Sequence, residues 1–504
     1  MILDNICGFS LDEEQREVVY CKNKHVLVCA GAGSGKTLTI IGKIRYLIEE
    51  KGVKNSDILV ISFTNDTVKS LKNKLLDTYN YEIDVLTFHK LGLKILDDTG
   101  VNIDICSGDF LDYLIDEYFS SVILENEHWL KKILKYFKIK YKNVDSYKNF
   151  VDLNNHDFRK FKFLISRFIK LFRTNNYNIE DFYKILVKAK KKIFSKKDIF
   201  VLRLILDIYL YYLNELESSL KLDFDDMITM AIDKIDDISF SYKYLIIDEY
   251  QDTSIVKFEF IKKLLNKMDS NLLVVGDDFQ SIYRFTGCDL NLFLNFKNYF
   301  EDSEILKITN TYRSPYELIN IAGNFVMSNK YQITKELKAN KSVSYPIEVI
   351  YSSNQCKTLK KLLDNLSDEV MIIGRNNFDI NRVIDKSFEI DNLGNILYKN
   401  NSDLKIRYLT AHKSKGLESK NVIIINLIND TYGFPSLQKD ERIIKYVNNY
   451  KSNYYLDEER RLFYVALTRT KNKVYLITIK GKESIFVKEL ISKYRKKLII
   501  KTYN

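Results

Sequence analysis

Short apolar runs that end in polar or glycine-rich clusters recur along the chain, and segments of helical periodicity follow them. Each of the segments 25–30, 58–65, 244–252 and 271–280 starts with such an apolar run. Buried strands that alternate with helices predict a parallel sheet with crossover connections. Ligands of such sheets gather at the carboxyl ends of the strands, so the polar residues that follow these runs are the first candidates for a functional site.

The pattern changes twice further along the chain. Between 96 and 222 the segments are helical and rich in Phe, Tyr and Lys, without buried strand runs, which predicts a helical insertion. From 301 onward a second set of strand candidates appears, at 303–309, 347–352, 369–375, 405–412, 421–427 and 473–479. The predicted fold class is α/β, with two parallel-sheet cores: 1–95 with 223–300, and 301–504.

Composition supports a globular chain of more than one domain. The chain has 504 residues, of which 46% are hydrophobic and 29% are charged, and domains average roughly 150 residues. No apolar run approaches the length of about 18 residues that a membrane helix needs, and the acidic N-terminus does not have the pattern of a signal peptide. We therefore expect a cytoplasmic protein without a membrane partner.

Charge and cysteine usage narrow the chemistry. The formal net charge of +11 suits a polyanionic partner such as nucleic acid. The six cysteines form no CxxC pair and have no histidine at ligand spacing. We expect them to be reduced core residues rather than a zinc site, an iron–sulfur cluster or a disulfide framework.

The glycine-rich segment after the first apolar run matches the phosphate-binding P-loop, with an alanine in the first glycine position. It consists of Ala30, Gly31, Ala32, Gly33, Ser34, Gly35, Lys36 and Thr37. In a P-loop, backbone N–H groups cradle the phosphates, the lysine reaches the β- and γ-phosphate oxygens, and the hydroxyl ligates Mg²⁺. ATP and Mg²⁺ are therefore the expected ligands.

A pair of carboxylates follows another apolar run. Asp248 and Glu249 come directly after 244–247, where phosphoryl transfer needs one carboxylate for the metal and another to orient the attacking water. We assign Asp248 to Mg²⁺ and Glu249 to the activation of water.

With these ATPase elements placed, further blocks identify relatives. The sequence resembles the UvrD/Rep-like branch of superfamily 1 DNA helicases, and most closely the helicase IV subgroup, from Leu11 to about Lys480 except for the helical insertion. The matching blocks are FSLDEEQ, AGAGSGKT, ISFTN, LTFHKLG, DEYQD, VVGDDFQSIYRFTG, TYRS, LTAHKSKGLE and EERRLFYVALTRT.

The resemblance implies further residues for the nucleotide. Gln15 would read the adenine edge and Tyr312 would stack on the base, whereas Leu38 stands where relatives often carry an arginine. Arg313 and Arg469 would be arginine fingers from the second core, which makes hydrolysis depend on domain closure.

Three more residues fall in blocks that relatives place at the nucleotide. Gln280 would sense the γ-phosphate and relay it to the DNA site, and Gly416 and Glu418 would contact the γ-phosphate and the ribose.

The resemblance also implies a path for single-stranded DNA. Sequence-independent binding of a single strand rests on aromatic stacking in a basic groove. The residues in blocks that line the strand in relatives are Phe63, Thr64, Asn65, Thr87, Phe88, His89, Tyr283, Phe285 and His412.

In family terms the cores are the RecA-like domains 1A and 2A, and the insertion is 1B. Large relatives also carry a domain called 2B, but only 376–404 separates the flanking strand candidates here, so we expect a vestigial 2B. The expected activity is that of an ATP- and Mg²⁺-dependent 3′→5′ translocase and helicase on single-stranded DNA and duplex junctions.

Two alternatives stay open from the sequence. The first is a motor with little unwinding of its own that serves a partner such as a nuclease in DNA repair or antiviral defence. The second is a non-catalytic nucleic-acid-binding protein, against which the intact Lys36, Glu249, Arg313 and Arg469 argue.

Overall fold

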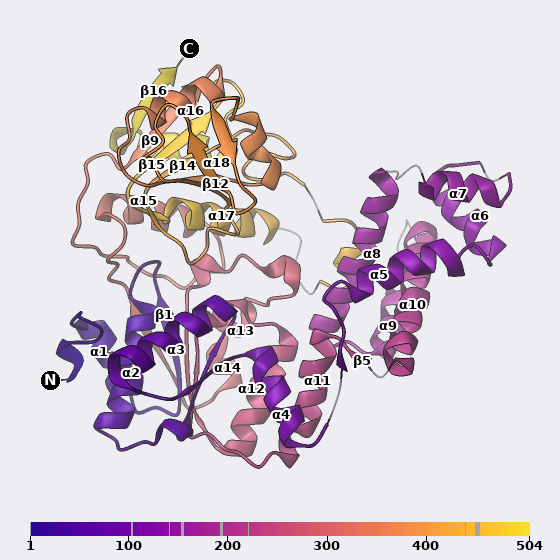
Figure 1. The fold of residues 1–504 in the computed structure, drawn as a ribbon, viewed down its shortest axis with the longest axis horizontal. Helices are drawn as coiled ribbons and strands as arrows, with labels where there is room; N and C mark the ends of the chain where they lie inside the picture. Colours follow the sequence, from indigo (N-terminus) through magenta and orange to yellow (C-terminus); the bar gives the residue numbers. More distant parts are fainter. Residues whose placement is uncertain are drawn as a thin grey trace.

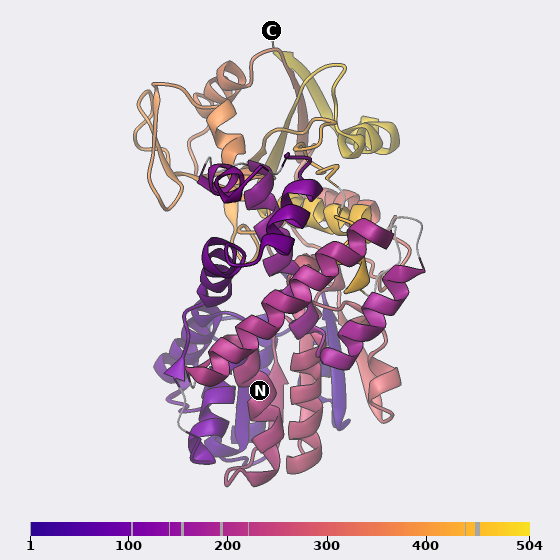
Figure 2. The same ribbon diagram turned by 90° about the vertical axis from the view of Figure 1, so that its right-hand side faces the viewer.

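The chain folds into three parts, here named 1A, 1B and 2A, of which 1A and 2A are stacked and 1B lies to one side (Figures 1 and 2). The computed structural model describes residues 2–101, 104–140, 142–152, 156–191, 195–219, 221–438, 440–448 and 454–503.

Domain 1A is built on a parallel sheet of six strands in the order β3-β2-β6-β7-β1-β8. The strands are β1 (His25–Ala30), β2 (Ile58–Ser62), β3 (Asp84–Thr87), β6 (Tyr244–Ile247), β7 (Asn271–Gly276) and β8 (Ser303–Ile308). Its helices are α1 (Glu13–Tyr20), α2 (Lys36–Glu49), α3 (Asn65–Tyr79), α4 (Phe88–Asp98), α11 (Phe224–Lys234), α12 (Ile255–Met268), α13 (Asn291–Leu294) and α14 (Phe296–Tyr299).

The strands of 1A are apolar throughout because both faces of the sheet are covered. Along β1 the side chains alternate between two cores: Leu27 and Cys29 join the cluster with α4, α11 and α12, whereas Val26 and Val28 join the cluster with α1, α2 and α3. The period of two residues in a strand produces this division. All strands run the same way, so their carboxyl ends form one edge of the sheet.

Two boundaries from the sequence are corrected by the sheet. The strand predicted at 303–309 belongs to 1A, not to the second core, because β8 pairs in parallel with β1 along its whole length. The first core therefore extends past 300 to Ile308. At the other boundary, α4 continues beyond 95 to Asp98, and Leu96 is buried in the 1A core.

Domain 1B is helical, as predicted. Its helices are α5 (Phe110–Glu117), α6 (Glu127–Tyr136), α7 (Val144–Asp152), α8 (His156–Thr174), α9 (Ile179–Lys190) and α10 (Ser195–Ser218). The chain enters and leaves 1B through the two-residue strands β4 (Asp104–Ile105) and β5 (Lys221–Leu222), which pair in parallel. Arg173 of α8 forms ion pairs with Asp223 and Asp226 at the start of α11, which fixes 1B to 1A.

Domain 2A has an eight-stranded sheet in the order β11-β12-β13-β10-β14-β15-β9-β16. The strands are β9 (Ile347–Ser352), β10 (Val370–Gly374), β11 (Phe388–Ile390), β12 (Asn395–Tyr398), β13 (Ile406–Thr410), β14 (Ser419–Ile424), β15 (Thr470–Thr478) and β16 (Ile499–Tyr503). Its helices are α15 (Tyr316–Val326), α16 (Gln355–Leu363), α17 (Tyr454–Leu467) and α18 (Ile485–Tyr494).

The segment 376–404 of 2A contains the 3₁₀ helix η8 (Asn377–Arg382) and the antiparallel hairpin of β11 and β12. The hairpin extends the 2A sheet through β13. It therefore forms an edge of 2A and not a separate domain.

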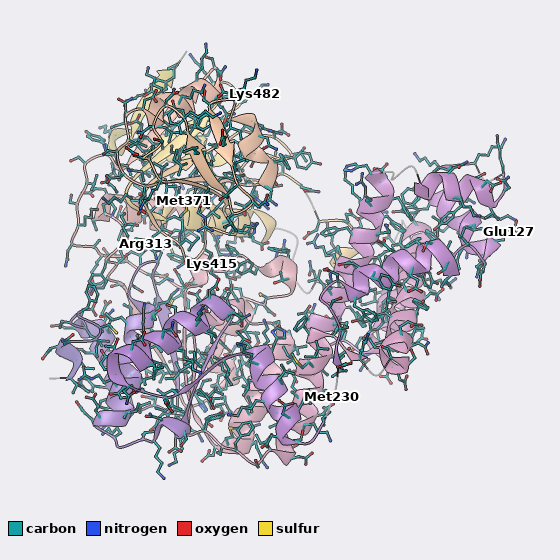
Figure 3. The ribbon with its side chains drawn as sticks, in the orientation of Figure 1. Glu127, Met230, Arg313, Met371, Lys415 and Lys482 are labelled. Atoms are coloured by element: carbon teal, nitrogen blue, oxygen red, sulfur yellow. The ribbon has the colours of Figure 1, made fainter. Side chains whose placement is uncertain are left out.

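Domains 1A and 2A share a packed boundary. Ala32, Phe279 and Ile282 of 1A belong to the hydrophobic core cluster of 2A, and Arg313 and Lys415 lie at this boundary (Figure 3). None of the helices in the described ranges has the length and apolar character needed to cross a membrane.

Candidate active site and nucleic-acid interface

The P-loop has a backbone that only glycine accommodates at two positions. Gly33 and Gly35 have φ of +73° and +79°. A Cβ atom at Gly33 would stand 2.6 Å from the Cβ of Arg313, and one at Gly35 would stand 2.7 Å from Nε2 of Gln15. The N-terminus of α2 has no side-chain cap, which leaves its N–H groups for an anion and fits the expected phosphate cradle.

Lys36 at the start of α2 faces the carboxylates at the end of β6. Its Nζ lies 3.1 Å from Oε1 of Glu249. Burial would raise the pKa of Glu249, but Lys36 and then Lys415 outweigh it and hold that pKa well below its usual range. Glu249 is therefore charged at neutral pH, as an acceptor for a water proton must be.

The pKa of Asp248 is shifted in the opposite direction. The residue is 7% exposed, and burial together with the charge of Glu249 raises the pKa of Asp248 to about 6. A nearby cation would favour its charged form. Together with the half-buried hydroxyl of Thr37, Asp248 has the chemistry of a ligand for a hard divalent cation.

The part of the chain that the structure describes holds no larger cage of protein ligands for a metal ion. No group of three or more His, Cys, Asp and Glu side chains there is placed so that it could hold a metal ion together. Mg²⁺ usually keeps several waters and binds through one or two carboxylates and the substrate phosphates, so Thr37 and Asp248 fit the ion without a larger cage.

Lys415 of 2A is a site residue that sequence reasoning missed. Its Nζ forms an ion pair with Asp252, lies 3.6 Å from Oε2 of Glu249, and donates a hydrogen bond to the carbonyl of Gln280 at 3.0 Å. Its side chain is only 9% exposed. Its position in the block LTAHKSKGLE is the one signal in the sequence that could have indicated it.

Gln280 lies at the end of a polar chain that crosses the domain boundary. Its Nε2 donates to Oδ2 of Asp277 at 2.7 Å, and its Oε1 accepts from Nη2 of Arg469 at 3.2 Å. Lys335, a fully buried lysine of 2A, holds Asp277 from the other side at 2.6 Å. Sequence reasoning did not single out Lys335, because an isolated lysine in a loop carries no pattern.

Arg313 is the second predicted arginine finger and contacts the P-loop region. Its Nε donates to Oε2 of Glu418 at 2.7 Å, and Lys471 pairs with the other carboxylate oxygen at 2.6 Å. The backbone N–H of Tyr312 donates to the carbonyl of Gly33 at 2.9 Å. Gly416 has φ of +82° and open space at its Cβ position, so the turn before Glu418 is unobstructed.

The predicted adenine contacts are placed unequally. The Tyr312 ring is 55% exposed, and its hydroxyl donates to Asp12. Gln15 is fully buried: its Oε1 accepts from the N–H of Asp12 and its Nε2 donates to the carbonyl of Ser34. The side chain of Gln15 thus joins α1 to the P-loop instead of presenting a free edge to a base.

A cleft of about 1210 Å³ runs between all three domains. His89, Phe285 and His412 line it, which brings together predicted strand-binding residues from both cores. Phe285 is 43% exposed, and its ring centroid lies 5.3 Å from that of His412 and 6.1 Å from that of Tyr283. Lys160 and Lys257 also line the cleft and add the positive charge that a phosphate backbone requires.

Two predicted strand contacts are corrected by burial. Phe88 is 2% exposed and packs in the 1A core, so its ring is not available for stacking. Thr87 is 7% exposed, and its hydroxyl caps α4 by accepting from the N–H of Lys90 at 3.3 Å. Both residues therefore support the cleft surface from below and do not line it.

The neighbouring block Phe63 to Asn65 stays at the surface. Phe63 is half-buried against Phe88, with the Lys257 ammonium 4.7 Å above its ring. Thr64 and Asn65 are exposed, and Thr64 caps α3. Of this block, the hydroxyl, the amide and one partly covered ring are accessible.

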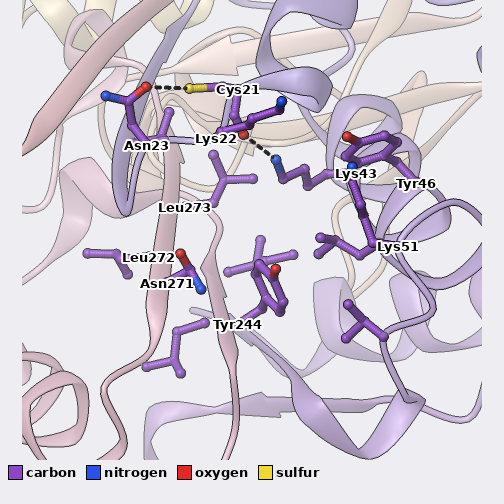
Figure 4. A pocket seen from close by; sticks show the side chains of 15 residues that line it. Cys21, Lys22, Asn23, Lys43, Tyr46, Lys51, Tyr244, Asn271, Leu272 and Leu273 are labelled. Atoms are coloured by element: carbon purple, nitrogen blue, oxygen red, sulfur yellow. Dashed lines mark hydrogen bonds between the residues drawn. The ribbon is translucent and has the colours of Figure 1, made fainter.

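A second, smaller pocket of about 310 Å³ lies at the amino ends of β1, β6 and β7 (Figure 4). Lys22, Lys43 and Lys51 line it, and the Lys43 ammonium donates to the carbonyls of Val19 and Cys21. It lies at the opposite edge of the sheet from the P-loop and is separate from the site described above.

Comparison with known proteins agrees with this geometry. Residues 11–301 match a family model described as the UvrD/REP helicase N-terminal domain, and residues 384–481 match one described as the UvrD-like helicase C-terminal domain.

Individual relatives align with this chain over nearly all of its length or over about two thirds of it. The chain is 28% identical to the ATP-dependent DNA helicase Rep of Buchnera aphidicola (subsp. Schizaphis graminum) over 92% of this chain and 69% of that protein. It is 24% identical to DNA helicase IV of Escherichia coli (strain K12), over 95% and 70% of the two chains. It is 28% identical to the ATP-dependent DNA helicase PcrA of Staphylococcus epidermidis, over 65% and 41%.

Proposed function

Because the chain belongs to the UvrD/Rep helicase family, we propose that it is an ATP-driven motor that moves 3′→5′ along single-stranded DNA and unwinds duplexes at junctions. The observation that carries this proposal is the contact of Gln280 in 1A with Arg469 in 2A. This contact crosses the boundary between 1A and 2A, and the proposed motor would open and close that boundary during each cycle of ATP hydrolysis.

At the phosphates, the N–H groups of the P-loop and the Lys36 ammonium would bind the β- and γ-phosphate oxygens. Thr37 and Asp248 would hold Mg²⁺, which when bound neutralises the phosphate charge. Glu249, kept charged by Lys36 and Lys415, would orient a water and take its proton. Arg313 and Arg469 would stabilise the charge of the transition state from 2A, so hydrolysis would require closure of the two domains.

Coupling to DNA would run through one short segment. Gln280 contacts Arg469, and the same segment continues to Tyr283 and Phe285, which lie beside His412 of 2A. A relative shift of 1A and 2A would move His412 against Phe285 and so change the grip on the strand. Binding would be independent of base sequence, because stacking and phosphate contacts carry it.

A strand-displacement assay on duplexes with 3′ or 5′ tails, beside an ATPase assay with and without single-stranded DNA, tests the proposal. We expect single-stranded DNA to stimulate ATP hydrolysis. We expect strand displacement on the 3′-tailed duplex and none on the 5′-tailed duplex. Affinity for single strands should fall with salt, with a slope of about −0.7 per contacted phosphate. Strand displacement on the 5′-tailed duplex alone would show the opposite polarity. An ATPase rate that does not change when DNA is added would contradict the proposal of a DNA-driven motor.

A second candidate is a translocase with little unwinding of its own that serves a nuclease. The specific observation in its favour is the segment 376–404, which holds η8 and a hairpin at the edge of the 2A sheet and so offers little surface to a duplex. Strong DNA-stimulated hydrolysis without displacement from either tailed duplex would favour this candidate.

A further inference from the structure

A segment of 2A reaches out of its own domain and packs into 1B. This segment, residues 440–448, is here called the arm; it lies between β14 and α17 in the chain. In Figure 1 the arm is the short yellow-orange piece beside α8, away from the rest of 2A.

The arm is anchored by apolar side chains. Ile443, Ile444, Tyr446 and Val447 belong to the hydrophobic core cluster of 1B, and Ile444 and Val447 have no exposed surface. The backbone is held as well, because Nδ2 of Asn175, directly after α8, donates to the carbonyl of Val447 at 3.2 Å. The arm is thus part of the 1B core and not a loop resting on its surface.

Asp440, the first residue of the arm, forms ion pairs with two other domains. Oδ1 of Asp440 lies 2.8 Å from the guanidinium of Arg167 in 1B, and its Oδ2 lies 3.2 Å from that of Arg284 in 1A. Arg284 also pairs with Glu458 of 2A at 2.8 Å. One carboxylate of 2A therefore ties together side chains of both other domains, directly beside Phe285.

The arm also forms a wall of the cleft. Asp440 and Glu441 line the cleft together with Arg167, Phe285 and His412. Domain 1A joins 1B through β4 and β5, 1B joins the arm, the arm joins 2A, and 2A packs on 1A. The parts that flank the cleft are therefore connected to one another in a closed series, through β4 and β5, the 1B core and the 1A–2A boundary.

We propose that the arm closes the strand-binding cleft into a ring, so that the preferred substrate is a single strand with a free end. This proposal rests on the proposed function. A free end can thread through the ring, whereas a closed circle enters only if the apolar anchor and the Asp440 bridge open together. The same enclosure would keep a threaded strand from leaving sideways.

The test compares association of a fluorescent linear single strand with that of a covalently closed circle of the same length and sequence, by stopped-flow anisotropy. We expect wild type to associate with the circle about 10-fold or more slowly than with the linear strand, the scale on which a required opening step lowers association rates. Ile444→Asn, which places an amide in the 1B core, should bring the two rates together.

Lys445→Asn is the matched control, because Lys445 lies in the same turn but is exposed and should keep the difference between circle and linear strand. Val447→Ala offers a milder release of the anchor, which should narrow the difference in part. Far-UV circular dichroism checks that each variant is folded.

Three outcomes would overturn the proposal. Equal association rates of wild type with the circle and with the linear strand would contradict the ring. This result would not contradict the proposed motor function. A rise in affinity for both strands in Ile444→Asn, with the ratio of their association rates unchanged, would mean that the arm competes with phosphate for Arg167 and Arg284. Failure to bind either strand would overturn the proposed function together with the ring.

Discussion

Arg469 of 2A donates a hydrogen bond from Nη2 to Oε1 of Gln280 in 1A, across 3.2 Å. The arginine is 1% exposed, and burial, followed by the nearby charge of Arg313, lowers its pKa to about 9. A nearby negative charge would offset both the burial and the repulsion from Arg313, so this guanidinium favours an anion beside it. The pair therefore joins the expected phosphate sensor to the expected arginine finger.

This contact predicts strong non-additivity. Arg469→Ala should lower the maximal rate of ATP hydrolysis at saturating DNA by about 10³-fold, the lower end of the range for an arginine finger. Gln280→Ala should also lower that maximum, without changing the DNA concentration at half-saturation. Because the two side chains act through one contact, the double variant should be little worse than Arg469→Ala. A double-mutant cycle on the maximal rate measures the coupling; fully additive losses would separate the two roles.

Phe285 and Phe88 should behave in opposite ways. Phe285→Ala removes an exposed ring, so the free energy of unfolding should hardly change, while the DNA concentration at half-saturation of ATPase activity should rise. Each stacked base contributes about 1–3 kcal/mol, which corresponds to a rise of roughly 5-fold or more in that DNA concentration. Phe88→Ala should instead cost about 3–5 kcal/mol of unfolding free energy. Urea denaturation beside ATPase titration separates the two; wild-type unwinding by Phe285→Ala would make that ring structural.

Lys36 and Glu249 should fail at different steps. Lys36→Ala should weaken nucleotide binding and lower hydrolysis by about 10²-fold or more, because a positioned donor to the phosphates is lost. Glu249→Gln should still bind ATP but should not turn it over, because the acceptor for the water proton is lost. Fluorescent-nucleotide binding and ATPase rates measure both steps, with Lys51→Ala as an exposed control beyond the end of α2. Normal DNA-stimulated turnover in either variant would remove its assigned role.

The sequence predicted local structure well where a strand is buried on both faces. The segments 25–30 and 347–352 are β1 and β9, because an apolar run bounded by polar residues specifies its own limits. The sequence predicted 303–309 in the second core, which is wrong, because the choice between β1 and a second-core strand as partner depends on pairing far along the chain.

The chemistry of the site was predictable where short motifs specify it, and less so where burial decides. Lys36 and Glu249 face each other as the pattern indicated. Phe88 and Gln15 stand in the right blocks, but their side chains point into the core and under the P-loop, which is a property of packing. Lys415 gains its importance only when 2A brings it to Asp252 across the domain boundary.

Lys415 should contribute to stability as well as to activity. Lys415→Met would leave the Asp252 carboxylate, itself 5% exposed at the side chain, buried without its cation, at a cost of about 3–5 kcal/mol. The double variant with Asp252→Asn should recover much of that loss, because it removes the uncompensated charge. Urea denaturation measures both, with the exposed neighbour Lys413→Met as control. An unfolding free energy for Lys415→Met equal to that of the control would show that the ion pair contributes nothing.

His412 should make the protein less stable as pH falls. Burial, and then the charges of Arg375 and Lys415, lower the pKa of this imidazole to about 3, whereas in the unfolded chain its pKa is about 6.5. Between these values the unfolded state binds a proton that the folded state does not, so the free energy of unfolding rises with pH and levels off above about pH 7. His412→Gln lacks this penalty.

The stability of His412→Gln relative to wild type should therefore increase by up to about 2 kcal/mol from pH 7.5 to pH 5. His128→Gln, at an exposed histidine of 1B, serves as the control substitution. Urea denaturation at a series of pH values measures the difference.

A neutral imidazole also cannot attract phosphate, so wild-type affinity for a single strand should gain nothing from His412 between pH 8 and pH 6. If affinity rises toward pH 6 in wild type and stays flat in His412→Gln, the imidazole is protonated on DNA and contacts the strand as a cation.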